Sequence, residues 1–247
     1  MKLTFLGSGG SAVSAKRACP SLLLNETLLF DLGPGAMTNL RKSKIDAERL
    51  TTVFISHCHA DHISDLIPFL WAIQIDGRQN PLQIYGPVGF RGVFEKLREC
   101  TNTSAKFFTF SLSVAELQFG QEIGDIRTCQ TDHSIPTLAF RVEKAGKSFC
   151  YTADTIYSPT VNRLAENVDL LVHEATFLED QAPIAELTRH STARMAGRSG
   201  RESKAKKLAL FHIPPPNEDR EEEFRKDAAE EYGSNVLIAS DLATIEV

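Results

Sequence analysis

The chain has 247 residues, of which 42% are hydrophobic and 24% are charged, and its formal net charge is −5. This length is enough to bury a full core, and we expect one α/β domain over residues 1–247. The negative charge argues against a protein that coats nucleic acid, although it leaves room for a local basic patch.

No apolar run reaches the length of a membrane span, because Pro68, Gln74 and Asp76 interrupt the best candidate. The apolar run at the N-terminus is short and strand-like, which is unlike a signal peptide. The five cysteines are odd in number and lack CxxC spacing. We therefore expect a cytoplasmic protein without membrane contact.

Alternating apolar and β-branched residues predict strands along the chain, and apolar residues at helical spacing predict helices between them. The expected strands are residues 2–6, 21–24, 27–31, 51–56, 82–85, 138–142, 148–152, 168–172, 208–211, 236–239 and 243–247, with several short ones between 106 and 130. Helices are expected from Ala36, at 63–70, 88–99 and 218–231, and between 181 and 204. Two strand-rich halves that each end in helices suggest two sheets packed face to face with helices outside.

The most informative stretch is HCHADH at residues 57–62, which places four potential metal ligands between a strand and a helix. His57 and His59 lie two residues apart, so an extended loop lets both imidazoles face one pocket. Asp61 and His62 follow at the start of the helix and would face a second ion. Imidazoles combined with a carboxylate suit zinc, manganese or iron. A histidine-rich surface loop is the less favoured alternative.

Three further polar residues lie where predicted strands end, namely His133, Asp154 and His212. Strand carboxyl ends are where an α/β sheet gathers its site residues. Each residue alone is compatible with an ordinary polar role, but together they complete two ligand sets with Asp154 bridging both. The sets are His57, His59 and His133 for one metal, and Asp61, His62 and His212 for the other. A bridging carboxylate offsets the repulsion between the ions, and a bridging hydroxide would be the nucleophile at neutral pH.

Two residues near this loop have open roles. Asp31 ends the predicted hairpin and would hold the ligand loop by hydrogen bonds, although a plain turn carboxylate is equally compatible with its position. Cys58 lies between two expected ligands, where a side chain usually points away, so we favour a bystander role.

Glu174 and His190 form a candidate acid pair. Glu174 follows an apolar strand, and His190 precedes a predicted helix for which Ser191 would be the N-cap. Cleavage of a phosphodiester or ester needs a proton for the departing alkoxide, and a histidine polarised by a glutamate can supply it. A purely structural contact between the two is the alternative. His173 is given no chemical role.

These residues, in this order along the chain, resemble the metallo-β-lactamase superfamily. More narrowly, the segments FLGSGG, KRACPSLLL, LFDLGPG, HEATF and HSTA are similar to ribonuclease Z and its phosphodiesterase relatives. The resemblance implies a four-layer αββα sandwich, two mixed sheets flanked by helices, with a two-metal site at one edge of the sheets. It also implies that Asp61 steers the hydroxide and that Glu174 and His190 protonate the leaving group.

Two features depart from the ribonuclease Z enzymes that mature tRNA. Bacterial forms insert a long tRNA-binding arm between the residues that match His133 and Asp154, where this chain has room only for a hairpin. A serine–arginine–tyrosine stretch after the last histidine is replaced by PPPN at residues 214–217. The expected catalytic centre is complete and the tRNA-binding arm is absent. Processing of tRNA would therefore need a binding surface on a partner or elsewhere on this chain.

One basic surface is a candidate for binding tRNA phosphates. Arg194, Arg198 and Arg201 fall on one face of the helix that follows His190, where they could contact phosphates close to the metals. A solvated face that balances the acidic helix at 218–231 is at least as compatible with the pattern.

We expect a two-metal hydrolase, most simply with Zn²⁺ and with Mn²⁺ or Fe²⁺ as alternatives, that cleaves phosphodiesters in RNA or in small or cyclic substrates. Hydrolysis of a non-phosphate ester or thioester on the same metals is the second hypothesis. A non-catalytic nucleic-acid-binding module is the third. The HEATF and HSTA segments favour the first hypothesis, and the complete ligand set argues against the third. A homodimer is suggested only by the resemblance.

Overall fold

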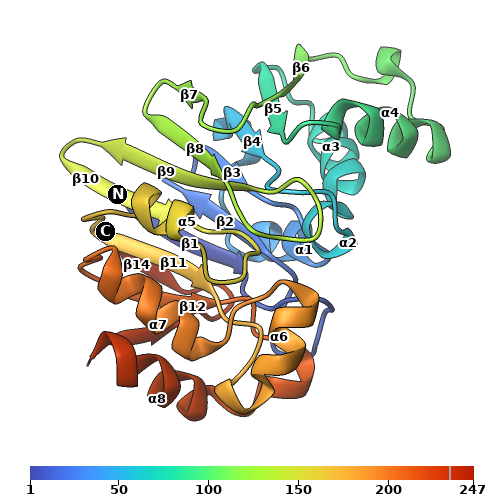
Figure 1. Cartoon of the computed structure of the whole chain (residues 1–247). Helices are drawn as coiled ribbons and strands as arrows, with labels where there is room; N and C mark the ends of the chain where they lie inside the picture. The colour runs from blue at the N-terminus through green and yellow to red at the C-terminus, as the bar shows by residue number, and fades with distance from the viewer. Residues whose placement is uncertain (234) are drawn as a thin grey trace.

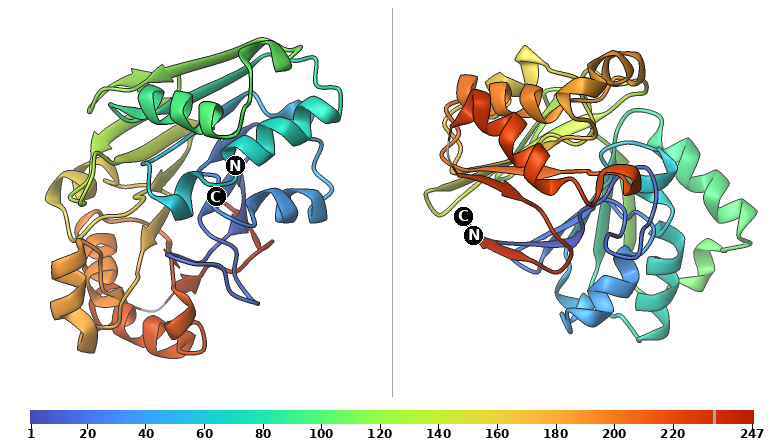
Figure 2. Two further views of the ribbon diagram at one scale, coloured as in Figure 1. Left: turned by 90° about the vertical axis from the view of Figure 1, so that its right-hand side faces the viewer. Right: turned by 90° about the horizontal axis from the view of Figure 1, so that it is seen from below.

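The computed structural model describes residues 1–233 and 235–247. The strands form two seven-stranded sheets that pack face to face, and helices cover the outer side of each sheet (Figures 1 and 2). This is the four-layer αββα arrangement that the sequence predicts.

The first sheet is mixed and has the strand order β14-β1-β2-β3-β4-β5-β6. Strands β1 to β3 are antiparallel neighbours and β3 to β6 run parallel. The C-terminal strand β14 pairs antiparallel with β1, so both ends of the chain lie in this sheet. Its strands are β1 (Lys2–Gly7), β2 (Ser21–Leu24), β3 (Leu28–Phe30), β4 (Thr52–Phe54), β5 (Leu82–Gly86), β6 (Leu112–Glu116) and β14 (Thr244–Glu246).

The second sheet is also mixed and has the order β13-β12-β11-β10-β9-β8-β7. Strands β7 to β10 are antiparallel and β10 to β13 are parallel. The central strands β11 and β12 are buried at every position, because the other sheet covers one face and helices cover the other. The strands are β7 (Glu122–Ile123), β8 (Ile126–Gln130), β9 (Leu138–Lys144), β10 (Lys147–Tyr151), β11 (Leu170–Glu174), β12 (Leu208–Phe211) and β13 (Val236–Ile238).

The helices divide between the two outer layers. The helices of the first half are α1 (Ala36–Lys42), α2 (Ala60–Ile63), α3 (Leu66–Ile75) and α4 (Phe90–Cys100), and those of the second half are α5 (Pro159–Leu164), α6 (Ala182–Thr188), α7 (Ala193–Glu202) and α8 (Glu221–Tyr232). Short 3₁₀ turns lie at η1 (Ala47–Arg49), η2 (Ala105–Phe107), η3 (Glu179–Gln181) and η4 (Pro215–Asn217). Among the described residues, no helix combines the length and the apolar character needed to cross a bilayer.

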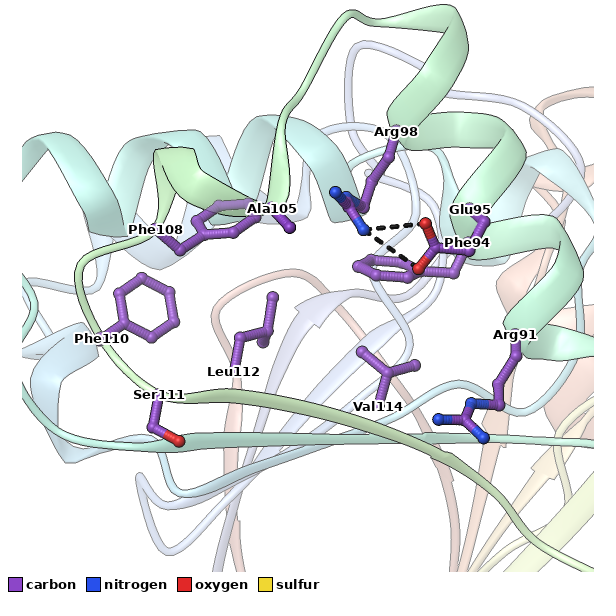
Figure 3. Close-up of a pocket in the computed structure, with 10 residues that line it drawn as sticks. All are labelled: Arg91, Phe94, Glu95, Arg98, Ala105, Phe108, Phe110, Ser111, Leu112 and Val114. Atoms are coloured by element: carbon purple, nitrogen blue, oxygen red, sulfur yellow. Dashed lines mark hydrogen bonds and ion pairs between the residues drawn. The ribbon is translucent and has the colours of Figure 1, made fainter.

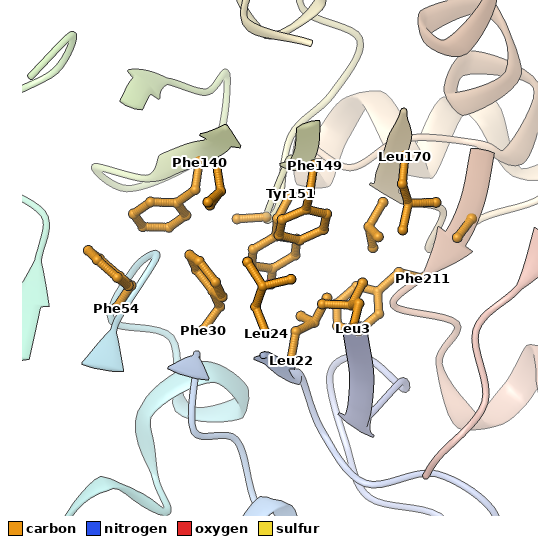
Figure 4. Close-up of a cluster of buried hydrophobic side chains, with 14 of the residues drawn as sticks. Leu3, Leu22, Leu24, Phe30, Phe54, Phe140, Phe149, Tyr151, Leu170 and Phe211 are labelled. Atoms are coloured by element: carbon orange, nitrogen blue, oxygen red, sulfur yellow. The ribbon is translucent and has the colours of Figure 1, made fainter. Parts of the chain in front are cut away.

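Aromatic and leucine side chains fill the space between the sheets (Figure 4). The Phe30 ring lies 5.2 Å from that of Phe54 on its own sheet and 5.3 Å from that of Phe140 on the opposite sheet, centroid to centroid. Tyr151 and Phe211 from the second sheet pack edge to face in the same layer, with centroids 5.6 Å apart. Burial of this layer is the main force that holds the sheets together.

Three strand ends next to this layer have left-handed backbone conformations. Asp31 after β3, Ala153 after β10 and His212 after β12 have φ values of +58°, +51° and +69°. Such conformations cost energy in residues with a Cβ and concentrate at functional sites. Here they turn the chain sharply at one edge of both sheets.

Several local boundaries differ from the sequence-based expectation. The helix expected at 63–70 is two helices, α2 and α3, of which α3 extends to Ile75. Helix α5 was not expected, although Ser158 caps its N-terminus by accepting a hydrogen bond from the Val161 backbone. The acidic helix α8 begins at Glu221 rather than at 218, because the proline-rich segment first forms η4. Thr192, not Ser191, caps α7, and the Ser191 hydroxyl instead donates to the Thr155 carbonyl.

Candidate metal centre

Seven side chains predicted as metal ligands converge at one edge of the two sheets. The loop after β4 and the start of α2 carry those of the HCHADH motif, while His133, Asp154 and His212 follow β8, β10 and β12. Their donor atoms form two groups that share Asp154, and within each group the atoms lie within 4.8 Å of one another. The grouping is the one expected from the sequence. Their role as metal ligands stays a prediction.

The first group consists of His57, His59, His133 and Asp154. His57 Nε2 lies 3.0 Å from His59 Nδ1, and His133 Nε2 lies 3.1 Å from the same atom. Asp154 presents its Oδ2 atom to this group, 3.6 Å from His57 Nε2.

The second group consists of Asp61, His62, Asp154 and His212. The Nε2 atoms of His62 and His212 lie 3.3 Å apart. Asp154 presents its other oxygen, Oδ1, 3.3 Å from His62 Nε2. Asp61 Oδ2 lies 3.3 Å from His212 Nε2 and also accepts the Ser11 backbone N–H at 2.8 Å. Asp154 thus faces each group with a different oxygen, as a bridging carboxylate would.

This donor set fits two divalent ions. Facing ring nitrogens 3.0–3.3 Å apart match the ligands of one Zn²⁺, since tetrahedral Zn–N bonds of about 2.0–2.1 Å place nitrogens roughly 3.3 Å apart. Asp154 Oδ1 is buried and accepts no hydrogen bond from the described residues. A cation would satisfy this oxygen. The clusters are consistent with a dinuclear site, and the same ligands accept several metals.

The outer ring nitrogens of four histidines have partners that fix their orientation. His57 Nδ1 lies 3.0 Å from Ser56 Oγ, and His212 Nδ1 lies 2.9 Å from Thr176 Oγ1. These hydroxyls donate their own protons to Asp31 and Glu174, so each accepts from the adjacent imidazole N–H. His62 Nδ1 lies 2.9 Å from Asp31 Oδ2 and His133 Nδ1 lies 3.0 Å from the Arg189 carbonyl. In their neutral forms, all four histidines would therefore present an Nε2 lone pair to the site.

Asp31 and Cys58 have the roles that the sequence left open. The buried Asp31 carboxylate accepts the Ser56 backbone N–H at 2.7 Å as well as the contacts from the Ser56 hydroxyl and His62, so it holds the ligand loop. Cys58 packs against the apolar cluster of the outer layer, and burial raises its pKa to about 11. Its geometry agrees with a bystander thiol.

The electrostatics of the site centre on Asp154. Burial raises its pKa, but the surrounding His212, His62 and His57 outweigh burial and hold that pKa well below its usual range. Burial lowers the pKa of His62, yet the Asp154 and Asp31 carboxylates outweigh it and raise the pKa well above its usual value. Burial and the adjacent His62 keep the pKa of His57 well below its usual value. The group therefore holds an ionised carboxylate beside a neutral imidazole.

Glu174 and His190 meet beside the two groups, as predicted. His190 Nδ1 lies 2.8 Å from Glu174 Oε1 and 3.9 Å from Asp154 Oδ2. The Thr155 and Thr176 backbone N–H groups hold the buried Glu174 carboxylate. Burial lowers the pKa of His190, but Glu174 outweighs it and raises the pKa to about 9. His190 is therefore protonated at neutral pH. Its side chain remains 14% exposed, so it can reach a substrate.

Sequence reasoning missed several residues that support this centre. The Arg189 guanidinium pairs with Asp132, one residue before His133, and so ties two loops of the site together. Ser11 holds Asp61, and Thr176 holds both His212 and Glu174. Apart from the Thr176–Glu174 contact, these contacts join residues far apart in the chain, and only the order of the motifs indicated that these loops would meet.

Two surface features lie outside this centre. The arginines of α7 are paired with glutamates, namely Arg194 with Glu230, Arg198 with Glu202, and Arg201 with Glu231. The structure thus favours a balanced charged face over a phosphate-binding one. A groove between α4 and β6 is lined by apolar side chains together with Arg91, Ser111 and the paired Glu95 and Arg98 (Figure 3), and none of the predicted site residues line it.

Comparisons with known proteins agree with this architecture. A family model described as a β-lactamase superfamily domain matches residues 26–213. The chain belongs to the metallo-β-lactamase superfamily. The metallo-β-lactamase fold protein YhfI from Bacillus subtilis superposes with a TM-score of 0.86 at 29% identity over 99% of each chain. The predicted fold is thereby confirmed.

The similarity to ribonuclease Z extends along the whole chain. Ribonuclease Z from Methanosarcina acetivorans is 27% identical over 303 residues, which cover 100% of this chain and 98% of the relative. The short form of human tRNase Z, ELAC1, superposes with a TM-score of 0.83 at 27% identity and covers 100% of this chain and 99% of its own. The resemblance to ribonuclease Z is thus confirmed. The alignment with this relative extends over 303 positions, against 247 residues in this chain, and here only the β9–β10 hairpin separates His133 from Asp154.

Zinc binding should release protons at neutral pH. The raised pKa of His62 means that its imidazole is charged in the metal-free protein at pH 7, whereas a metal requires its neutral form. Affinity should therefore increase with pH, with at least about one proton released per chain. Titration calorimetry in buffers of different ionisation enthalpy measures this number, and a pH-independent affinity with no proton release would contradict the assignment.

Gly10 should be required for the second group. A Cβ at this position would lie 2.2 Å from His212 Nδ1, so Gly10→Ala must displace the imidazole or the loop. We expect at least about tenfold weaker binding of one Zn²⁺, the lower end of the effect of losing a ligand's partner. Gly92→Ala in α4 is the matched control, because nothing lies within 4 Å of its Cβ. Equal zinc affinity of the two variants, measured against a competing chelator, would argue against this requirement.

Proposed function

We propose that this chain hydrolyses phosphodiester bonds with two divalent ions, most simply Zn²⁺, in a single domain over residues 1–247. The observation that carries the proposal is the Glu174–His190 pair beside Asp154 in a chain similar to ribonuclease Z over its whole length. The substrate would be RNA or a small or cyclic diester. The ions, when bound, would activate water and offset the charge of the phosphate.

The ligand residues would divide their tasks as their geometry suggests. His57, His59 and His133 would hold one ion through nitrogens that face one another, and Asp154 would contribute one oxygen to each ion. His62 and His212 would hold the second ion with Asp61. The Asp61 carboxylate is 14% exposed and fixed by the Ser11 backbone, so it would also orient the attacking water.

His190 would act as the acid for the leaving group. Its Nδ1–H donates to Glu174, which leaves the opposite ring nitrogen to donate a proton to the departing oxygen. The Glu174 carboxylate favours the protonated form of His190, because it raises the pKa of this imidazole. An alkoxide leaving group needs such assistance much more than a thiolate or an acidic phenol does. The pair therefore favours phosphodiesters over thioesters as substrates.

The acid role predicts that the effect of His190→Ala depends on the leaving group. For a diester with an alkoxide leaving group we expect kcat to fall about 10²–10⁴-fold. Bis-p-nitrophenyl phosphate releases the weakly basic p-nitrophenolate, so the variant should cleave it nearly as fast as the wild type. Glu174→Gln should show the same trend with a smaller loss. Equal losses of His190→Ala on both substrates would contradict the acid role.

The proposed activity itself is tested by direct assay. Protein loaded with zinc, and separately with manganese, is incubated with bis-p-nitrophenyl phosphate and with an unprocessed tRNA precursor, beside Asp154→Ala as the control. Cleavage of the small diester alone would support an armless phosphodiesterase. Cleavage of both substrates, lost in the control, would support a ribonuclease. Two bound metals without cleavage of either substrate would overturn the proposal and favour the ester or thioester alternative.

A further inference from the structure

A buried side-chain hydrogen bond crosses between the sheets beside the apolar layer, close to the backbone hydrogen bond from Leu138 N–H to the Ser56 carbonyl. The hydroxyl of Tyr151, the last residue of β10, donates to Asp31 Oδ2 at 2.7 Å, and both side chains are fully buried. The Tyr151 ring itself packs among apolar side chains (Figure 4), with its centroid 6.3 Å from that of Phe30 and 5.6 Å from that of Phe211. A phenylalanine would make the same ring contacts. Packing therefore does not account for the hydroxyl.

The acceptor of this hydroxyl also holds a predicted metal ligand. Asp31 Oδ2 receives the Ser56 hydroxyl at 2.8 Å and faces His62 Nδ1 at 2.9 Å. These two donors belong to the first sheet and its loop, whereas Tyr151 belongs to the second sheet. Among the described residues, Tyr151 is the group of the second sheet that donates a hydrogen bond to the Asp31 side chain, which orients His62.

The position of Tyr151 in its strand gives this contact a consequence for both ligand groups. Asp154 lies three residues after Tyr151, at the turned end of the same strand. Apolar packing brings sheets together without direction, whereas a metal site tolerates errors of only about 0.2 Å in ligand distance. A short, buried hydrogen bond supplies direction, because it weakens steeply when its angle or length changes. The Tyr151–Asp31 contact can therefore set the strand that carries Asp154 against the loop that carries His62.

We propose that Tyr151 is a positioning residue of the metal centre, whose hydroxyl acts through Asp31 to hold His62 against Asp154. The inference rests on the proposed binding of metal by the second group. It assigns a function to a residue that touches neither metal nor substrate.

The test compares Tyr151→Phe with the wild type and with Tyr85→Phe. Tyr85 is a matched control because its ring stacks on Phe54 at the same interface, at 5.5 Å, and takes no part in the Asp31 contacts. Stepwise zinc dissociation constants of the metal-free proteins are measured against a chromophoric chelator. The visible spectrum of bound Co²⁺ reports the ligand geometry, and urea unfolding of the metal-free proteins reports stability.

We expect Tyr151→Phe to weaken one of the two zinc sites about three- to tenfold, which is less than the 10–100-fold loss caused by removing a direct partner of a ligand. Its Co²⁺ spectrum should change, while Tyr85→Phe should match the wild type in both respects. Unchanged zinc affinity and spectrum in Tyr151→Phe, with or without lower stability in urea, would overturn the positioning role. Failure of the wild type to bind zinc would instead contradict the proposed metal centre itself.

A double variant distinguishes an effect of Tyr151 through Asp31 from a general disturbance of the fold. If Tyr151 acts through Asp31, then Tyr151→Phe added to Asp31→Asn should weaken zinc binding no further than Asp31→Asn alone. Effects that multiply in the double variant would show that Tyr151 acts by another route and would overturn the inference.

Discussion

The Asp154 carboxylate lies fully buried where the two sheets meet, and the structure around it is arranged to keep it ionised. A buried charge is costly unless it is compensated by neighbouring groups. Histidines from the first sheet's loop and from the end of β12 compensate it, and its two oxygens face different sets of rings. The same carboxylate is where two cations would meet. The position of the Asp154 carboxylate therefore depends on both sheets, and it determines where the two cations would bind.

Apolar packing and directional hydrogen bonds have different tasks in building this site. Burial of the aromatic layer supplies the free energy of folding that holds the two sheets, and so their strand ends, together. The hydrogen bonds at the outer nitrogens of the histidines then determine which nitrogen of each ring faces inward. The left-handed residues Asp31, Ala153 and His212 make the turns that bring these groups into place. Three of the left-handed non-glycine residues thus lie where the chemistry is proposed to occur.

Much of the site could be predicted because its residues carry local signals. The spacing of His57, His59 and His62, and the location of Asp154 at a strand end, can be read without knowing the fold. The supporting contacts could not be read in this way. Tyr151 and Asp31 are 120 residues apart, and nothing in the sequence around Tyr151 distinguishes its hydroxyl from an ordinary core tyrosine.

The arginines of α7 show a case in which a local sequence pattern allows two interpretations. Its spacing is compatible with phosphate binding and with ion pairing, and only the packing of α7 beside α8 favours the second. The order of the strands in the sheets also depends on contacts between distant parts of the chain. Alternation predicts the strand near the C-terminus, whereas its pairing with β1 depends on how the completed sheets close. Long-range contacts therefore decide what local patterns leave open.

A crystal structure of the zinc-loaded protein, recorded with anomalous diffraction, would show whether Asp154 bridges two metal ions. We expect two anomalous peaks roughly 3.5–4 Å apart, with one oxygen of Asp154 on each. A single peak, or two peaks of which Asp154 touches only one, would contradict this bridging role.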